Sequence, residues 1–345
     1  MNINDLVRKN IANMKPYSSA RDEFKGEASI FLDANENPYD NGLNRYPDPL
    51  AWVVKKALAP IKGIAPEHIF LGNGSDEVID VLIRIFCEPR LDNIVILPPT
   101  YGMYAVSAET SDVEILKVNL TSDFQPDVEK ILATANDTSK ILFICSPNNP
   151  TGNSIDTGKM LNLINGFKGI VVIDEAYSDF AAESAVQWIG TFPNLVVMQT
   201  FSKAWGLAAI RLGMAFASTE IIALMNKVKP PYNVNELTQK AALEALQNEA
   251  KKNEQVKEIK EEREKLAEIL RGLPIVEKVY PSDANFLLAK MKNGNKTYDY
   301  LLTKGIVTRN RSNVVLCENG VRFTVGTPEE NVKLIAALKE AEFII

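Results

Sequence analysis

The stretch "NLVVMQTFSKAWGLAAIRLGMAFAS" (residues 194–218) places one lysine between two apolar runs that are typical of buried strands. Neither run alternates between apolar and polar residues, which indicates a sheet covered on both faces. Lys203 follows the first run, close to the hydroxyls of Thr200 and Ser202, and Arg211 opens the second run. A buried amine is unfavourable unless a partner or a reaction uses it, so this stretch marks a candidate site.

Similar apolar runs precede this stretch and alternate with helical patterns. The runs are "NIVILPP" (93–99), "KILFICSPNNP" (140–150) and "GIVVIDEAY" (169–177), and "SDEVIDVLIRIFCE" (75–88) has helical periodicity. Such alternation is typical of an α/β fold with a largely parallel sheet. We therefore predict a large domain over residues 45–235, with a mostly parallel central sheet flanked by helices.

The pattern changes near residue 235. Residues 235–273 are densely charged, contain no proline and have helical periodicity, which predicts one long helix or two joined helices with a solvated face. Shorter strand and helix patterns follow. We predict a smaller α+β domain over residues 236–345, with residues 1–44 forming an N-terminal arm and part of that domain.

Composition excludes several classes of function. The chain has 345 residues, a net charge of −6 and a pI near 5.2, which argues against nucleic-acid binding. No apolar run approaches the roughly 20 residues that span a bilayer, and the N-terminus lacks the apolar core of a signal peptide. We therefore expect no membrane association and a cytoplasmic location.

Cysteine and histidine are scarce. Cys87, Cys145 and Cys317 are far apart, and without CxxC spacing they predict neither disulfides nor a zinc site. The single histidine, His68, is expected to be structural. We predict no metal site, and a proton shuttle that is not histidine.

Two loops after apolar runs have both a structural and a functional interpretation. In "LGNGSDEVID" (71–80), Ser75 or Asp76 could cap a helix, and the free backbone N–H groups of Gly74, Ser75 and Asp76 would also suit a phosphate. In "SPNNPTG" (146–152), Asn149 is either part of a rigid turn or an amide fixed toward a cleft.

A third run ends on carboxylates. Asp174 at the end of a buried strand needs a partner, which is a metal, a protein cation or a protonated ring nitrogen of a cofactor. Metal is disfavoured because no further ligands cluster nearby in the sequence. Lys203 is either an ion-pair partner or an amine that forms a Schiff base. An amine, a buried carboxylate and a phosphate cradle are together the protein groups that pyridoxal phosphate requires.

These motifs, in this order, resemble the fold-type I pyridoxal-phosphate aminotransferases of the aspartate aminotransferase superfamily. Several segments look like one branch, the histidinol-phosphate aminotransferases. The segments are "LDANENPY" (32–39), "NRYPDP" (44–49), "GNGSDE" (72–77), "PPTYGMY" (98–104), "SPNNPTG" (146–152), "DEAY" (174–177), "TFSKAWGLAAIRLG" (200–213), "SDANFLL" (282–288) and "VRFTVGT" (321–327). The resemblance covers most of the chain.

The resemblance implies pyridoxal 5′-phosphate as cofactor and a role for each matching residue. Lys203 would be the catalytic residue, binding the cofactor's aldehyde and then moving a proton between the substrate's α-carbon and the cofactor. Asp174 would pair with the ring nitrogen, and Tyr101 would stack on the ring. The remaining cofactor contacts would come from Gly74, Ser75, Asp76, Asn149, Tyr177, Thr200, Ser202, Arg211 and, across a homodimer with shared active sites, Tyr46 of the neighbouring subunit.

The resemblance also implies a substrate site. Arg322 would receive the carboxylate of glutamate or the phosphate of histidinol phosphate, because a guanidinium fork suits either anion. Arg309 would assist it, with Arg311 as the alternative, Asn149 would also face the substrate, and Tyr17 would close over it. The implied reaction converts L-histidinol phosphate and 2-oxoglutarate to imidazole-acetol phosphate and L-glutamate, a step of histidine biosynthesis.

Three alternatives remain open at this point. An aromatic amino-acid aminotransferase or a threonine-phosphate decarboxylase would keep the same lysine, aspartate and phosphate-binding arginine. The effector-binding domain of a regulator is disfavoured, because such proteins carry an added DNA-binding segment for which we expect no room.

Overall fold

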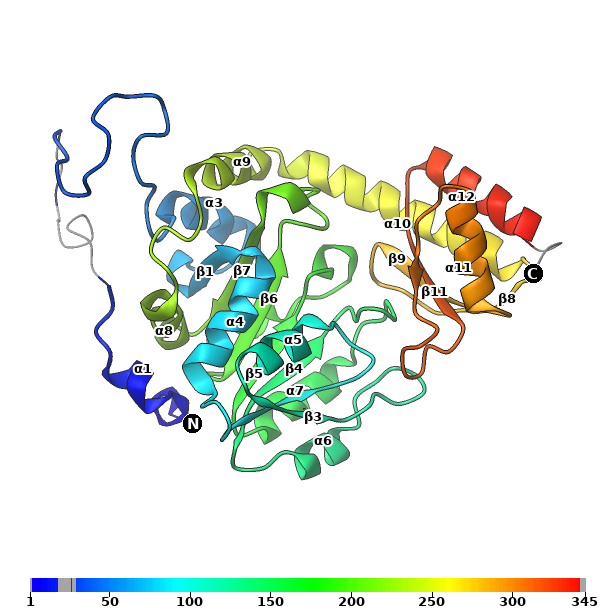
Figure 1. Cartoon of the computed structure of the whole chain (residues 1–345), viewed down its shortest axis with the longest axis horizontal. Helices are drawn as coiled ribbons and strands as arrows, with labels where there is room; N and C mark the ends of the chain where they lie inside the picture. Colours follow the sequence, from blue (N-terminus) through cyan, green and yellow to red (C-terminus); the bar gives the residue numbers. More distant parts are fainter. Residues whose placement is uncertain (1, 18–25, 27–28, 342–345) are drawn as a thin grey trace.

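The chain folds around two sheets of unequal size. The computed structural model describes residues 2–17, 26 and 29–341. Figure 1 shows the larger sheet and its helices on the left, and the smaller sheet at the far end of the long helix α10 (Glu249–Arg271). This agrees with the predicted α/β fold with a second, smaller α+β part.

The larger sheet has seven strands in the order β1-β7-β6-β5-β4-β2-β3. Only β7 runs antiparallel to the strands beside it, so the sheet is mostly parallel, as predicted. The strands are β1 (Ile69–Asn73), β2 (Asn93–Ile96), β3 (Glu114–Lys117), β4 (Ser139–Cys145), β5 (Ile170–Asp174), β6 (Leu195–Thr200) and β7 (Leu212–Ala217). The five strand-like runs of the sequence are β2, β4, β5, β6 and β7.

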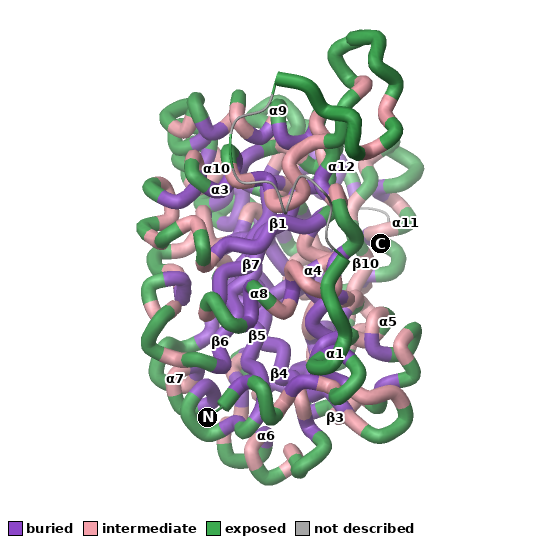
Figure 2. The backbone as a smooth tube through the Cα atoms, turned by 90° about the vertical axis from the view of Figure 1, so that its left-hand side faces the viewer, coloured by how far each residue is buried: buried purple, intermediate pink, exposed green. Residues whose placement is uncertain are grey.

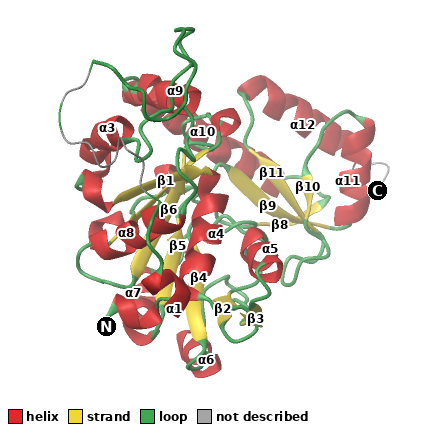
Figure 3. Ribbon diagram, turned by 60° about the vertical axis from the view of Figure 1, so that its left-hand side comes forward, coloured by secondary structure: helices red, strands yellow, loops and turns green. Residues whose placement is uncertain are grey.

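Helices cover both faces of this sheet (Figure 3). They are α3 (Trp52–Lys62), α4 (Gly74–Phe86), α5 (Met103–Thr110), α6 (Val128–Thr134), α7 (Thr157–Gly166) and α8 (Thr219–Val228). The central strands are buried along nearly their whole length, as Figure 2 shows by their purple colour. Burial on both faces explains why these strands are continuous apolar runs rather than alternating ones.

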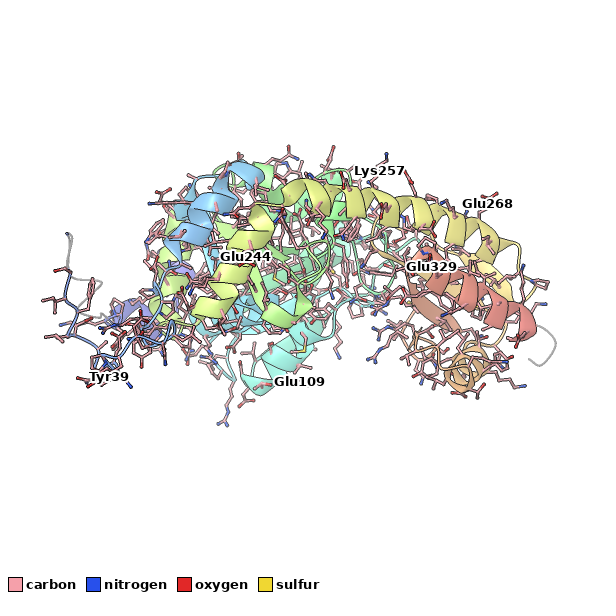
Figure 4. The ribbon with its side chains drawn as sticks, turned by 90° about the horizontal axis from the view of Figure 1, so that it is seen from above. Tyr39, Glu109, Glu244, Lys257, Glu268 and Glu329 are labelled. Carbon is pink, nitrogen blue, oxygen red and sulfur yellow. The ribbon has the colours of Figure 1, made fainter. Side chains whose placement is uncertain are left out.

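The predicted helical region of residues 235–273 is two helices, α9 (Glu236–Leu246) and α10. Figure 4 shows Glu244, Lys257 and Glu268 on the outer side of these helices, which is the predicted solvated face. Beyond α10 the smaller sheet has the order β10-β11-β9-β8 and is antiparallel throughout. Its elements are β8 (Val276–Val279), β9 (Phe286–Met291), α11 (Gly294–Thr303), β10 (Arg309–Asn310), β11 (Gly320–Thr324) and α12 (Pro328–Ala341).

The N-terminal segment packs against the larger sheet and its helices. Ile3, Val7 and Ile11 join the core that α4 forms with the sheet, and Arg8 pairs with Glu88 at 3.0 Å. Part of the predicted arm, residues 1, 18–25 and 27–28, lies outside the described residues. The domain boundaries at 44/45 and 235/236 stay predictions.

The scarce residues lie as expected. All three cysteines are buried free thiols. His68 is held by a hydrogen bond of 2.7 Å between its Nδ1 and the backbone oxygen of Ala217, which is a structural role. Over the part of the chain that is described, no helix combines the length and the apolar character needed to cross a membrane.

Candidate active site

One cavity of about 790 Å³ lies at the carboxyl ends of β4, β5 and β6 and extends to the smaller sheet. Open α/β sheets bind ligands at this edge. The cavity brings together Ser75, Asp76, Tyr101, Asn149, Asp174, Tyr177, Thr200, Ser202, Lys203, Arg211, Arg309 and Arg322, all of which were predicted from the sequence. Arg311 lines it too.

One end of the cavity is formed by the start of α4. The backbone N–H of Gly74 donates to the oxygen of Arg211 at 2.8 Å, which ties the helix start to β7. A side chain at Gly213 would place its Cβ 2.2 Å from the Ser75 nitrogen, so only glycine permits this close approach. The free N–H groups and positive dipole of a helix start favour an anion there.

Side chains add further donors at the same end. Thr200 and Ser202 place their hydroxyl oxygens 3.0 Å apart, and the guanidinium of Arg211 lies beside Gly74 and 3.6 Å from a carboxylate oxygen of Asp76. Two hydroxyls, a guanidinium and a helix start form a donor set that suits a phosphate dianion.

Asp174, the last residue of β5, lies deeper in the cavity and is almost fully buried. Its Oδ2 accepts a hydrogen bond of 2.6 Å from the Tyr104 hydroxyl, and its Oδ1 accepts one of 3.1 Å from the Ala176 nitrogen. Burial raises the pKa of Asp174 to about 6, although the Tyr104 hydrogen bond acts in the opposite direction. A positively charged partner would offset this burial.

Tyr104 is a site residue that the sequence analysis missed. It is fully buried, and its ring stacks on Phe143 with centroids 4.6 Å apart. The available signal was its place in "PPTYGMY", three residues after Tyr101, and in the structure it lies in the first turn of α5. Its partner Asp174 is 70 residues away, so the contact itself is not visible in the sequence.

Lys203 stands in the turn after β6, and its side chain is exposed to the cavity. The expectation of a buried lysine was therefore wrong, because the chain leaves the sheet at Thr200 and carries the amine into the open space. The surrounding protein still removes part of its hydration, which lowers the pKa of Lys203, and the charge of Arg322 lowers it further. Its Nζ lies 5.7 Å from the centre of the Tyr177 ring.

The remaining polar groups surround this amine. The Tyr101 hydroxyl donates to Asp76 at 3.1 Å, and Tyr177 is buried beside Phe286. Asn149 accepts a hydrogen bond from Nη1 of Arg322, so an amide of the large sheet meets an arginine of the small one.

Gly74 adjoins this cavity without lining it, and two further predicted site residues lie away from it in the single chain. Tyr17 and Tyr46 line a separate cavity of about 600 Å³, together with Trp52 and Lys227. The Tyr46 ring stacks on Tyr232 with centroids 4.5 Å apart. Their predicted roles toward cofactor and substrate are not tested by this arrangement.

The cavity fits pyridoxal phosphate by the chemistry of its groups. It has an end whose donors suit a phosphate, a buried carboxylate with a raised pKa and an amine with a lowered one, all lining one cavity. Among the described residues, no three His, Cys, Asp or Glu side chains are close enough together to hold a metal ion.

Comparison with known proteins gives a consistent result. Residues 29–338 match the family model of class I and II aminotransferases. Histidinol-phosphate aminotransferases of Cytophaga hutchinsonii and Parabacteroides distasonis are each 56% identical to this chain, over 98% of both sequences. The crystal structure of the Clostridium acetobutylicum histidinol-phosphate aminotransferase superposes with a TM-score of 0.81 and 28% identity, covering 88% of this chain and 92% of that one.

Aminotransferases of this class use pyridoxal phosphate, which agrees with the donor set described above. The model match spans most of the chain, and the identity to the two relatives holds over nearly the full length. The chain therefore belongs to the class I and II aminotransferases and, within them, to the histidinol-phosphate aminotransferase family.

Proposed function

We propose that this protein transfers the amino group of L-histidinol phosphate to 2-oxoglutarate, giving imidazole-acetol phosphate and L-glutamate in histidine biosynthesis. The observation that carries the proposal is one cavity lined by Lys203, by Asp174, by the polar donors at the start of α4, and by the arginines of the smaller sheet. The names of the full-length relatives support the substrate.

Pyridoxal phosphate, when bound, supplies an electron-accepting ring that makes the proton on the substrate's α-carbon removable. Ser75, Thr200, Ser202 and Arg211 would hold its phosphate. Asp174 would face its ring nitrogen. Burial destabilises the ionised form of this carboxylate, so a positively charged ring nitrogen beside it would stabilise that form.

Lys203 would bind the aldehyde and move the proton. Its lowered pKa increases the share of neutral amine near neutral pH, and only the neutral amine is a nucleophile or a base. The positive charge of Arg322 lowers the pKa of Lys203 further. Lys203 follows β6 of the larger sheet and Arg322 lies on β11 of the smaller one, so the cavity is formed by both sheets together.

Arg322 would bind the acidic group of each substrate in turn, assisted by Arg309. A guanidinium fork binds a carboxylate and a phosphate with the same geometry, which permits both half-reactions in one site. Binding of an anion would replace the present hydrogen bond from Arg322 to Asn149, leaving the Asn149 amide available to the cofactor or the substrate.

We also infer a homodimer in which Tyr46 reaches the cofactor of the neighbouring subunit and Tyr17 covers its substrate. The segment that carries them is rich in exposed apolar side chains, with Ile30 at 75%, Leu32 at 88% and Tyr39 at 82% exposure. Tyr39 lies at the outer edge of the molecule in Figure 4. A second copy would cover this surface.

Subunit mixing tests the dimer. Lys203→Ala and Tyr46→Ala proteins should each have little activity, while hybrids of the two should regain it, because one of their two sites is then intact. If mixing restores nothing although hybrids form, Tyr46 does not act across subunits.

The function is tested by a parallel assay of histidinol phosphate, phenylalanine and threonine phosphate with 2-oxoglutarate. Histidinol phosphate should be preferred, and Lys203→Ala is the control for enzyme-dependent turnover. A wide preference for phenylalanine would favour an aromatic aminotransferase, and carbon dioxide released from threonine phosphate would favour the decarboxylase. The cytoplasmic location stays a prediction.

A further inference from the structure

A pair of side chains joins β5 to β6 just beyond their backbone ladder. The paired register ends at Asp174 and Met198, and the Glu175 nitrogen donates to the Met198 oxygen at 2.8 Å. One position further, Nε2 of Gln199 donates to Oε2 of Glu175 at 2.8 Å. This hydrogen bond, which we call the strand tie, continues the pairing of the two strands by one residue.

The strand tie lies behind the Lys203 cavity. Asp174 and Thr200 line that cavity, whereas their chain neighbours Glu175 and Gln199 point to the opposite face, because successive residues of an extended chain alternate. Gln199 lines a separate cavity of about 560 Å³, and both side chains of the tie are buried. The tie therefore acts on the Lys203 cavity by placing its neighbours, without touching a ligand there.

Thr200 is held on its other side by β7. It pairs with Gly213, and its hydroxyl donates to the Leu212 oxygen at 3.3 Å. Leu212 also forms a bridge with Gly74, so the Thr200 hydroxyl and the start of α4 form one unit. Asp174 lies on β5, outside this unit. Its distance from the unit depends on the β5–β6 ladder and, at the cavity end, on the strand tie.

The strand tie is kept at an energetic cost. Oε1 of Gln199 is buried and has no hydrogen-bond partner in the described part of the chain. Turning the amide would place Oε1 against the Glu175 carboxylate instead. Burial raises the pKa of Glu175, while hydrogen bonds from Ser184, Ala185 and Gln199 act in the opposite direction. An orphaned buried acceptor is unfavourable, so a fixed amide that keeps one calls for a functional reason.

We propose that Glu175 is a positioning residue, which acts through Gln199 to fix the distance between Asp174 and the donor groups of β6, β7 and α4. The cofactor would span these two ends, with its ring nitrogen toward Asp174 and its phosphate toward Thr200, so its affinity depends on their separation. This inference rests on the proposed cofactor contacts, and it holds whichever amino donor the enzyme uses.

The test compares two ligands that use different parts of the site. Pyridoxal phosphate would contact both ends, whereas inorganic phosphate would contact only the donor groups of β6, β7 and α4. The full-length protein is freed of cofactor. Its dissociation constant for pyridoxal phosphate is measured by absorbance titration, and that for inorganic phosphate by competition. Gln199→Met removes the strand tie. Ser184→Ala is the matched control, because it removes a hydrogen bond of 2.6 Å to the same Glu175 oxygen but leaves β5 joined to β6.

Gln199→Met should weaken pyridoxal-phosphate binding at least about tenfold, as the loss of groups behind metal ligands does. Its dissociation constant for inorganic phosphate should change less than about threefold, as should that of Ser184→Ala for pyridoxal phosphate. Urea unfolding should show at least as large a loss of stability in Ser184→Ala, because Gln199→Met also removes the orphaned acceptor. An equal loss of pyridoxal-phosphate affinity in Ser184→Ala, or an equal loss of phosphate affinity in Gln199→Met, overturns the proposal.

Three further variants complete the experiment. Gln199→Ala removes the same amide with a smaller side chain, so the same outcomes apply to it if Gln199→Met does not fold. Glu175→Gln lets the Gln199 amide turn and accept from the new amide, which keeps a neutral tie, so it should lose less than about threefold in pyridoxal-phosphate affinity. A loss as large as in Gln199→Met would assign the effect to charge and contradict the proposal. Thr200→Val tests the proposed phosphate contact separately, because it should weaken both ligands whether or not the tie matters.

Discussion

Replacing Tyr104 by Phe removes one hydroxyl and leaves the ring that stacks on Phe143. The hydroxyl donates its hydrogen bond to Asp174 at 2.6 Å, inside a fully buried environment. A net hydrogen bond to a charged group contributes about 1.5–3 kcal/mol and one between neutral groups about 0.5–1.5 kcal/mol. The substitution therefore destabilises the ionised carboxylate more than the protonated acid, by about 1–1.5 kcal/mol.

This difference fixes the sign of the pH dependence. Since 1.36 kcal/mol corresponds to a tenfold change, Tyr104→Phe should move the pKa of Asp174 from about 6 to about 7. The folded-state pKa already lies above the ordinary value of 3.8, so the contribution of Asp174 to the stability of the cofactor-free protein falls as the pH rises from about 3.8 through 6. In the variant this fall should extend to a higher pH and be larger.

The assay is urea unfolding of the cofactor-free protein at pH 5 and pH 9. The variant should be less stable than the wild type by about 0.5–1.5 kcal/mol at pH 5 and by about 1.5–3 kcal/mol at pH 9. Tyr300→Phe is the matched control, because it removes an exposed hydrogen bond of 3.1 Å to Glu340 and should cost less than about 0.5 kcal/mol at both pH values. A loss in Tyr104→Phe that is the same at both pH values would refute the reasoning.

Three other changes have outcomes that follow directly from the structure. Borohydride reduction with pyridoxal phosphate should add the pyridoxyl mass at Lys203 in tryptic peptides, and Lys203→Ala should lose this label; labelling elsewhere at equal yield contradicts the assignment. Gly213→Ala should weaken pyridoxal-phosphate binding at least about tenfold, measured by dialysis, because its Cβ would lie 2.2 Å from the Ser75 nitrogen and displace the helix start. Burial lowers the pKa of Lys55 to about 8, so below that pH the protein holds a charged amine in a buried site at a cost in stability. Lys55→Met should therefore raise the stability at pH 7 by about 1–3 kcal/mol, and denaturant titrations should show this gain shrinking toward pH 10.5.

Much of the larger sheet was predictable because its strands are buried on both faces. Continuous apolar runs identify β4, β5 and β6 without any knowledge of their partners. β3 (Glu114–Lys117) and β8 (Val276–Val279) were not predicted, because they have four residues each, include charged side chains and are partly exposed. The antiparallel direction of β7 also depends on its pairing with β1 and β6, which no local pattern encodes.

Site residues were predictable where a charged side chain stands at the end of a buried strand. Asp174 and Lys203 are unusual residues at the ends of apolar runs, so their types alone attract attention. Tyr104 was missed because a tyrosine on a helix facing the core is a common packing residue, and its role depends on a partner 70 residues away. Tyr46 illustrates another limit, since a single chain does not contain the neighbouring subunit on whose cofactor it is predicted to act.

The cavity is completed by contacts that hold the small sheet against the large one. The Ser154 nitrogen donates to Asp283 at 3.0 Å, and the Asp283 nitrogen donates to the Gly152 oxygen at 2.7 Å. Gly152 is closely packed, because a Cβ there would lie 2.6 Å from the Ser282 hydroxyl. These contacts join "SPNNPTG" to "SDANFLL", two segments that carry few of the predicted catalytic groups.

On α10, Lys252 pairs with Asp179 at 3.0 Å and fixes the start of the helix that leads to the small sheet. Arg309 and Arg322 of the smaller sheet are therefore positioned relative to Lys203 by two separate attachments, one at the SPNNPTG turn and one at α10. On the proposed function, a substrate anion that displaced Asn149 from Arg322 would change a third contact between the sheets while the other two remained. The amine and the arginines would then keep their relative placement while ligands exchange, which the proposed binding of two different acids in turn requires.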